Sequence, residues 1–260
     1  MRLASQIFER KNLFGAAWTQ TLYNSEALEH LLIQEFKEEL LLDSCAADSP
    51  RLFAVSALTN KYPPEPFLFR NYKARTPSRY NGCCLAPVWE GLRASTAAPP
   101  FFSAFKTVGL EHHDGALVAN NPAAMALHEM RCIWGQAARL ECLVSIGTGR
   151  FLSNSSPNWS IINATKAMVY SATDSEGVHE ALLDLLPPNS YFRFNPLIPE
   201  INMEESNSSK LLELQELGAR FVLEHGSSIN AACKLLNMKQ PSANGFCTTL
   251  TRIRKIMPRL

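Results

Sequence analysis

A short segment that is apolar on both of its faces, Leu52-Phe53-Ala54-Val55-Ser56-Ala57-Leu58, constrains the fold of this chain most strongly. A strand with one face in water alternates apolar and polar side chains, whereas a strand covered on both faces does not. The segment is therefore predicted to be an interior strand of a sheet. A second strand is predicted at Phe67–Tyr72, after a loop that contains Pro63, Pro64 and Pro66.

Helical segments alternate with the strands. Helices are predicted over residues 25–42, 87–98 and 121–134. Pro99-Pro100 ends the second helix, because proline disfavours helical geometry in the residue before it. Asn121 caps the third helix and Pro122 takes its first position. The strand Leu140–Ile146 then stops at Gly147-Thr148-Gly149, and this order of elements predicts an α/β fold with a layered sheet.

Beyond Arg150 the pattern becomes mostly helical. Helices are predicted over about 160–186 and 204–238, with the strand Tyr191–Phe194 between them. The sequence has no internal repeat and no composition shift that marks a second core. We therefore expect these helices to cover the same sheet.

The charge balance excludes one class of partner. Lys and Arg number 25 against 24 for Asp and Glu, so no net field draws the chain onto nucleic acid or an anionic membrane. No apolar run reaches the length of roughly 18 residues that a membrane-spanning helix needs. The first ten residues also lack the apolar core of a signal peptide. Any membrane contact is therefore expected to be peripheral.

The cysteines indicate a reducing compartment. Their number is odd, none forms a C-x-x-C pair, and they stand at positions 45, 83, 84, 132, 142, 233 and 247. This spacing fits neither a disulfide framework nor a zinc site. We expect reduced thiols, and therefore an intracellular protein that acts at most peripherally on an organelle membrane.

Asp114-Gly115 is the first candidate for chemistry. The pair lies between a predicted strand that ends near His112 and the helix that begins at Asn121, so the carboxylate is expected on a connecting loop at a sheet edge. Asp-Gly is also a common turn dipeptide, since glycine accepts unusual backbone angles and aspartate bonds to its own backbone. Taken alone, the dipeptide is therefore better explained as a plain turn.

Three ordered motifs extend this observation. They are Arg93-Ala94-Ser95-Thr96-Ala97-Ala98-Pro99, Asp114-Gly115-Ala116-Leu117-Val118-Ala119-Asn120-Asn121-Pro122 and Val144-Ser145-Ile146-Gly147-Thr148-Gly149. In this order and at these separations they resemble the patatin-like phospholipases. Tyr191-Phe192-Arg193-Phe194-Asn195-Pro196, preceded by Leu185-Leu186-Pro187-Pro188, resembles the calcium-independent, gamma-type branch. The resemblance extends from about Ser5 to about Gly226.

The resemblance implies a fold and a domain division. The fold is a three-layer α/β/α sandwich that lacks its N-terminal part in this chain. Residues 1–150 would form the C-terminal part of the catalytic domain, and residues 151–260 a mostly helical region packed on the same core.

The resemblance also implies a serine–aspartate dyad that hydrolyses acyl esters of phospholipids without a cofactor or a metal. A serine on a Gly-x-Ser-x-Gly elbow attacks the ester carbonyl, and an aspartate accepts its proton. Residue by residue, Asp114 matches the base, and Gly115 and Ala116 match the turn that presents it. A base must lie within about 3 Å of the hydroxyl, or one water away.

The serine half of the dyad has no match. No serine in the sequence has glycine both two positions before and two after it, and the 12 glycines form no glycine-rich loop for an oxyanion. Both parts are expected upstream of Met1. Loss of one oxyanion donor alone costs on the order of 100- to 1,000-fold in rate. The chain is therefore expected to be a carboxylic ester hydrolase by family that is inactive as given, and the alternative is a non-catalytic lipid- or protein-binding relative.

Other side chains have a structural explanation beside the functional one. The candidates for a nucleophile, a histidine partner or a metal ligand are Ser95, Ser145, His112, His113, His128 and Glu129. The two serines lie on a predicted helix and strand, not on an elbow. Adjacent histidines point to opposite faces of a strand, so a Ser-His-Asp arrangement with Asp114 is disfavoured. Arg93 is expected in an ion pair, and Asn120 or Asn121 as a helix cap.

Overall fold

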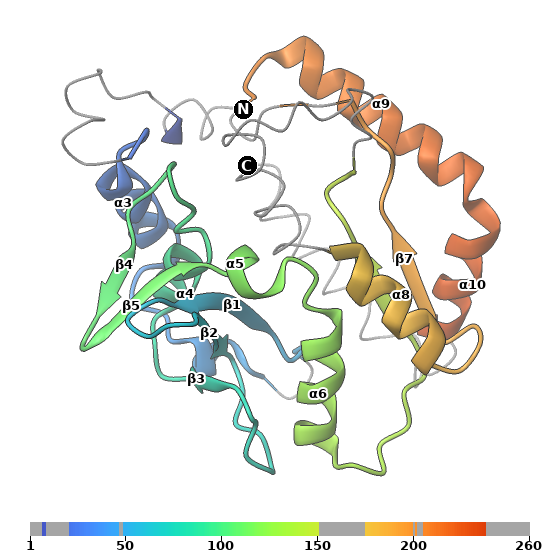
Figure 1. The fold of residues 1–260 in the computed structure, drawn as a ribbon, viewed down its shortest axis with the longest axis horizontal. Helices are drawn as coiled ribbons and strands as arrows, with labels where there is room; N and C mark the ends of the chain where they lie inside the picture. The colour runs from blue at the N-terminus through green and yellow to red at the C-terminus, as the bar shows by residue number, and fades with distance from the viewer. Residues whose placement is uncertain are drawn as a thin grey trace. The chain divides into compact units, whose positions relative to one another are not determined.

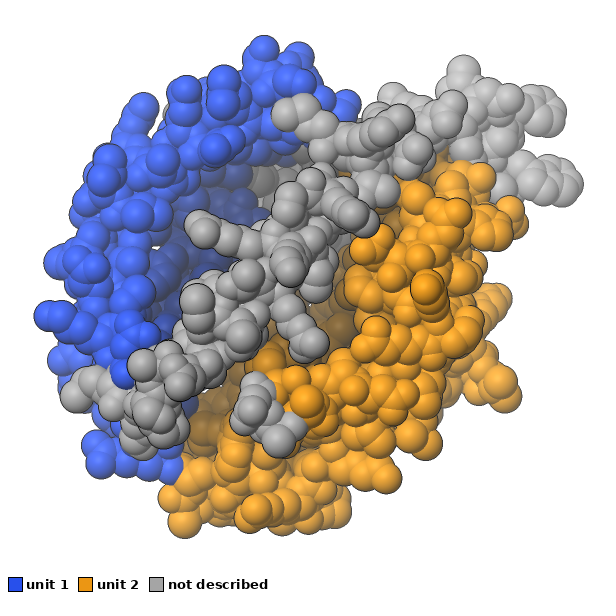
Figure 2. Space-filling view, turned by 180° about the vertical axis from the view of Figure 1, so that it is seen from behind, with its two compact units in different colours: residues 1–5, 139–158, 179–260 blue, residues 6–138, 159–178 orange. Residues whose placement is uncertain are grey.

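The computed structural model describes residues 7–8, 21–46, 49–150, 175–199, 201 and 205–237. The chain divides into two compact units, which Figure 2 shows in different colours. Unit 1 comprises Met1–Ser5, Arg139–Asn158 and His179–Leu260, and unit 2 comprises Gln6–Ala138 and Trp159–Val178. The predicted division of the chain at residue 150 stays a prediction.

Unit 2 contains a five-stranded sheet (Figure 1). Its strands are β1 (Phe53–Leu58), β2 (Glu65–Arg70), β3 (Asn81–Cys83), β4 (Phe105–Thr107) and β5 (Leu110–Asp114). Their order across the sheet is β3-β2-β1-β5-β4, and only the β2–β3 pair is parallel. The strand β1 is therefore central, which confirms the interior strand predicted from its apolar faces.

Helices cover both faces of this sheet. They are α3 (Ser25–Phe36), α4 (Val88–Ser95), α5 (Ala116–Ala119) and α6 (Ala123–Trp134). On one face, Ala94 of α4 packs in a buried cluster with Phe67 and Phe69. On the other face, Met125 of α6 packs with Val55 and Leu68. Successive residues of β2 thus point to opposite layers, as the alternation of a strand requires, and the α/β/α layering is confirmed.

The first predicted helix is too long. The helix α3 ends at Phe36, where the N–H of Lys37 donates to the Ile33 carbonyl at 2.8 Å with a φ of 51°. A short 3-10 helix, Leu41–Ser44, follows, and Leu41 packs against the cluster under α4. The chain changes direction after Phe36, and Leu41 reaches this cluster from the 3-10 helix. The predicted start is accurate, because Asn24 caps the helix by accepting from the Glu26 N–H.

Unit 1 has a two-stranded parallel sheet and the C-terminal helices. Its elements include β6 (Leu143–Ile146), β7 (Tyr191–Phe194), α9 (Ser208–Glu224) and α10 (Gly226–Asn237). The helix α8 (Ser175–Leu185) enters this unit at His179. Residues 160–174 of the predicted helix lie outside the described residues. The prediction of a helical C-terminal region is confirmed.

Among the described residues, no helix is both long enough and apolar enough to cross a membrane.

Candidate active site

Asp114 is the last residue of β5. This strand runs antiparallel to β1, and Asp114 lies level with Ser56. The backbone N–H of Asp114 donates to the carbonyl of Ala97, just beyond α4, at 3.0 Å. The prediction of a loop position is therefore wrong by a few residues, because pairing with β1 continues as far as Asp114. Asp114 is therefore positioned by its pairing with β1 and by its hydrogen bond to Ala97, which belongs to the Arg93–Pro99 motif.

The turn after Asp114 is closed by its own hydrogen bonds. The Oδ1 atom of Asp114 accepts from the Ala116 N–H at 2.7 Å. The Gly115 carbonyl accepts from the N–H groups of Val118 and Ala119 at 3.1 and 2.8 Å, which starts α5 directly. A Cβ atom on residue 115 would overlap the carbonyl oxygen of Val55, so the turn can approach β1 only with glycine. The glycine of the motif is therefore required by the close approach of the turn to β1.

Burial raises the pKa of the Asp114 carboxyl, because desolvation disfavours its charged form. The hydrogen bond from the Ala116 N–H acts in the opposite direction and offsets part of this effect. In the part of the chain that the structure describes, this N–H is the single hydrogen-bond donor to the side chain. A half-buried carboxylate with a raised pKa and one oxygen that receives no hydrogen bond from a described residue has an acceptor available for a proton.

The two histidines before Asp114 point to opposite sides of β5 and do not form a catalytic chain with it. His112 hydrogen-bonds with Ser56 Oγ through Nδ1 at 3.0 Å and with Thr107 Oγ1 through Nε2 at 3.4 Å. It is fully buried, and burial lowers its pKa. His113 hydrogen-bonds with Thr59 Oγ1 at 2.8 Å. Both rings are explained as satisfied structural groups.

The two candidate serines lie on regular elements. Ser95 is the last residue of α4, and Ser145 is buried in β6, where its Oγ accepts from Arg193 Nη1 at 2.9 Å. A nucleophile needs an exposed hydroxyl on a sharp turn. Neither residue meets that condition.

Arg93 forms the predicted ion pair, but in the interior. Its Nε donates to Glu29 Oε1 at 3.0 Å, and its Nη2 donates to the Ser103 carbonyl at 3.0 Å. The side chain is fully buried over the Phe105 ring, and burial lowers its pKa. Arg93 therefore ties α4 to α3 and to the segment before β4. It supports the site from the far side of α4.

Glu129 and His128 are explained without a metal. Glu129 is buried and accepts hydrogen bonds from Arg70, Tyr72 and Ser78 at 2.6 to 2.8 Å. His128 contacts the edge of the Tyr80 ring. No group of three His, Cys, Asp or Glu side chains that could hold a metal is found within the described ranges.

Pro122 is the N-cap of α6, so the predicted start of this helix is one residue early, and Asn121 stands just before the cap. The Oδ1 atom of Asn121 accepts from the Ala123 N–H at 3.2 Å, and its Nδ2 donates to the Ser175 carbonyl at 3.0 Å. Asn120 is exposed at the end of α5. The segment after Asp114 is thus held at α5 and again at the start of α6.

The third motif and the gamma-type motif meet in unit 1. The strands β6 and β7 pair in parallel, with Ser145 level with Arg193. The Oδ1 atom of Asn195 accepts from the Gly149 N–H at 2.9 Å, and a Cβ on Gly147 would overlap the same side chain. These glycines are therefore required by the approach of Asn195. Their role in this unit is structural.

Sequence reasoning missed two groups that hold the site. The Ala97 carbonyl is a backbone atom, so no side-chain pattern indicates its bond to Asp114. The Ser56–His112 pair joins residues 56 positions apart, and only the β1–β5 register brings them together. A correct strand order would have revealed the second group.

Comparison with known proteins gives consistent results. The family model described as Patatin-like phospholipase matches residues 3–127. Calcium-independent phospholipase A2-gamma from Oryctolagus cuniculus is 35% identical over 263 residues, which cover 97% of this chain and 32% of the relative. The Homo sapiens protein of the same name is 35% identical, with 97% and 33% covered. Phospholipase A I from Arabidopsis thaliana is 29% identical, with 88% and 20% covered.

The chain thus spans about a third of the length of the mammalian relatives. The similarity includes both units, because the matches to these relatives cover 97% of the chain. The motif with Asp114 lies within the region that the family model matches.

Proposed function

This chain belongs to the patatin-like phospholipase family, a family of lipid acyl hydrolases, and from that premise we propose that Asp114 is the general base of an ester-hydrolysing site. One observation carries the proposal. The backbone N–H of Asp114 donates to the Ala97 carbonyl, and its side-chain Oδ1 accepts from the Ala116 N–H, so both the backbone and the carboxylate are held in place. This arrangement leaves Oδ2 available for a proton, and fixed geometry is the first requirement of a general base.

The proposed chemistry is that of a serine–aspartate dyad. A serine hydroxyl attacks the ester carbonyl and transfers its proton to Asp114, and the proton then passes to the leaving alcohol. Water next attacks the acyl-serine and gives its proton to Asp114, which passes it to the departing serine oxygen, so that the fatty acid is released and the serine hydroxyl is restored. The raised pKa of Asp114 supports this role, because a base works best when its pKa lies near the working pH.

The proposed substrate is the acyl ester of a phospholipid, cleaved without calcium. This choice rests on the names of the relatives, which are calcium-independent phospholipases. We also propose an intracellular setting, which is supported by the free thiols at all six described cysteines.

We further propose that these 260 residues alone do not hydrolyse esters. The sequence has no Gly-x-Ser-x-Gly elbow and no glycine-rich oxyanion loop. Hydrolysis by the dyad route therefore requires a serine that the given sequence does not present.

Two measurements on the chain as given test this part. Hydrolysis of a short-chain p-nitrophenyl ester and covalent labelling by a fluorophosphonate are both expected at background level. Hydrolysis that Asp114→Asn abolishes would show that the chain contains a nucleophile after all, and would contradict the proposal.

A chimera tests Asp114 itself. A Gly-x-Ser-x-Gly elbow segment and its oxyanion loop, taken from a patatin-like phospholipase, are fused ahead of Met1. We expect phospholipid hydrolysis, and a loss of at least about 100-fold with Asp114→Asn. Glu111→Gln on the same strand is the matched control, because Glu111 forms an exposed ion pair with Lys106 at 3.2 Å. Equal activity of the Asp114→Asn chimera and its parent would refute the role of Asp114.

A further inference from the structure

A cavity of about 590 Å³ lies in unit 2, apart from the Asp114 turn. Its described lining consists of Ser49, Pro50, Arg51, Lys73, Arg75, Ile133 and Trp134. These residues come from the segment before β1, the segment after β2 and the C-terminal end of α6. Asp114 lies level with Ser56, five residues further along the chain than Arg51. The volume falls in the range of about 300 to 1,000 Å³ that small-ligand sites occupy.

The cavity is cationic. Arg51, Lys73 and Arg75 supply three positive charges, and no acidic side chain is among the described residues that line it. Lys73 and Arg75 form no ion pair with any residue that the structure describes. Arg51 donates to Cys45 Sγ and to the Ala46 carbonyl, which leaves its charge unneutralised. Cations without a described counter-charge in the lining of one cavity favour an anionic ligand.

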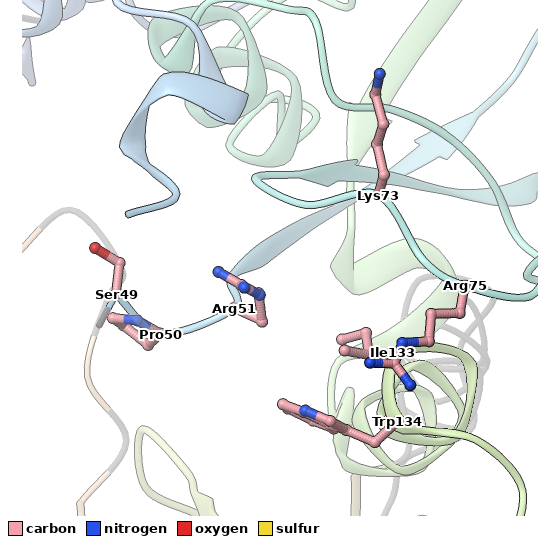
Figure 3. Close-up of a pocket in the computed structure, with 7 residues that line it drawn as sticks. All are labelled: Ser49, Pro50, Arg51, Lys73, Arg75, Ile133 and Trp134. Atoms are coloured by element: carbon pink, nitrogen blue, oxygen red, sulfur yellow. The ribbon is translucent and has the colours of Figure 1, made fainter. Parts of the chain in front are cut away.

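The arrangement of the side chains favours a phosphate group. Figure 3 shows Ser49, Pro50 and Arg51 on one side of the cavity and Arg75, Ile133 and Trp134 on the other, while the Lys73 ammonium points away from both groups. The two arginines therefore border the cavity from two sides. Guanidinium is planar and presents paired donors that match phosphate oxygens.

The apolar neighbours indicate where the phosphate comes from. Trp134 is 56% exposed, and Leu52, next to Arg51, is 55% exposed. Tryptophan concentrates at the boundary between water and lipid, where its ring is buried and its N–H stays near polar groups. A soluble phosphate has no apolar part that could contact these exposed side chains. Cations beside exposed apolar residues are the combination that binds an anionic lipid surface.

We propose that this cavity binds the phosphate of an anionic phospholipid headgroup, with Arg51 and Arg75 as the contacting cations, and so docks unit 2 on a membrane. The choice of a lipid source rests on the proposed hydrolase function, whereas the anion site rests on the cavity alone. The net charge of +1 gives no sign of the site, because it averages this cluster against acidic residues elsewhere.

The test is co-sedimentation of the full chain with vesicles of phosphatidylcholine, with and without phosphatidylserine. We expect binding to the anionic vesicles that weakens with added salt. Arg51→Ala/Arg75→Ala is expected to lower the partition coefficient by about 30-fold, and Arg75→Ala alone by about 5-fold, since each cation near the surface contributes similarly. Arg75→Ala removes no side-chain hydrogen bond among the described residues. Circular dichroism verifies that each variant is folded.

The matched control removes two lysines of unit 2 that are not among the described lining of the cavity. Lys61→Ala/Lys106→Ala also removes two positive charges, and Lys61 lies in the β1–β2 connection, at the opposite end of that strand pair from the cavity. This control is expected to bind like the parent chain. Trp134→Ala is expected to weaken binding, whereas Tyr62→Ala, at a residue 96% exposed in the same connection as Lys61, is not.

Three outcomes would overturn the proposal. The first is parent-like vesicle binding by Arg51→Ala/Arg75→Ala, and the second is an equal loss in the Lys61→Ala/Lys106→Ala control. The third is stabilisation of the chain against heat by inorganic phosphate without any vesicle binding, which would assign the site to a soluble ligand. Vesicle binding needs no hydrolysis, so its failure leaves the chimera test of Asp114 unaffected.

Discussion

Two carboxylates in unit 2, Asp114 and Glu129, have opposite surroundings. Asp114 is half-buried at the end of β5 and receives one backbone hydrogen bond. Glu129 is 1% exposed on α6 and receives two hydrogen bonds from Arg70 and one each from Tyr72 and Ser78. Burial raises the pKa of Asp114, whereas its hydrogen bonds and ion pair lower the pKa of Glu129 to about 2.

The difference separates the carboxylate proposed as a general base, Asp114, from a structural carboxylate, Glu129. The charged form of Glu129 is stabilised by four donors, so it cannot accept a proton at neutral pH. Asp114 is desolvated by burial and receives one hydrogen bond, so its charged form is less favoured than it would be in water, and its pKa is raised. A general base needs this second condition, and a structural anion needs the first.

The largest expected effect is a loss of stability when Glu129 is replaced by a neutral residue. Glu129→Gln leaves the Arg70 guanidinium buried without its counter-charge, and we expect a loss of about 3 to 5 kcal/mol in the free energy of unfolding. Urea denaturation at pH 7 measures it. The control is Glu111→Gln, which removes an exposed ion pair with Lys106 and should cost about 1 kcal/mol or less. Similar losses in the two variants would show that the buried pair contributes no more than a surface one.

The pH dependence of the free energy of unfolding tests the same difference between Glu129 and Asp114. The folded-state pKa of Glu129, about 2, lies below its usual value of 4.5. Its contribution to stability is therefore fully present above pH 4.5 and is lost as the pH falls toward 2. The difference in free energy of unfolding between the parent chain and Glu129→Gln should shrink by about 3 kcal/mol over this interval. A difference that stays constant from pH 6 to pH 2 would mean that Glu129 does not titrate with folding.

A smaller effect is expected at the turn beside Asp114. Gly115→Ala places a Cβ against the Val55 carbonyl, and the resulting backbone shift should cost about 1 to 3 kcal/mol. Gly218→Ala is the control, because no atom lies within 4 Å of its added Cβ in the interior of α9. That change should stabilise the helix by roughly 0.5 to 1 kcal/mol. A neutral Gly115→Ala would show that the turn is free to move away from β1.

The two carboxylates also differ in how far the sequence reveals them. Asp114 lies in a contiguous motif, so its turn and its family are predictable from neighbouring residues. The central place of β1 was also predictable, because a strand apolar on both faces must be covered twice. These features depend on local pattern, which the sequence contains in full.

The Glu129 network depends on long-range pairing. Arg70 and Glu129 are 59 residues apart, and their contact requires the packing of α6 on β2. The cationic cavity has the same origin. Phe53 pairs with Arg70, so the register of the hairpin brings Arg51 level with Tyr72 and therefore close to Lys73. Strand register is set by tertiary packing, so a sequence without that register does not reveal either group.

The smallest expected effect is a gain in stability, and it is expected when Asp114 loses its charge. The folded state holds the Asp114 proton more tightly than the unfolded state does, so ionisation works against folding at neutral pH. Asp114→Asn keeps the acceptor for the Ala116 N–H and removes the charge. We therefore expect the variant to be more stable than the parent at pH 7. The gain should disappear below pH 3.8, the usual pKa of the carboxyl, where both states of the parent are protonated.

Urea denaturation between pH 3 and pH 8 tests this sign. A loss of stability at pH 7 would place Asp114 with Glu129 among the structural anions, and the comparison between them would fail. A gain would show that the chain keeps a carboxylate whose charge disfavours folding. A residue kept at a cost in stability is expected where chemistry requires it, and such a gain would therefore support the proposed role of Asp114 as a general base.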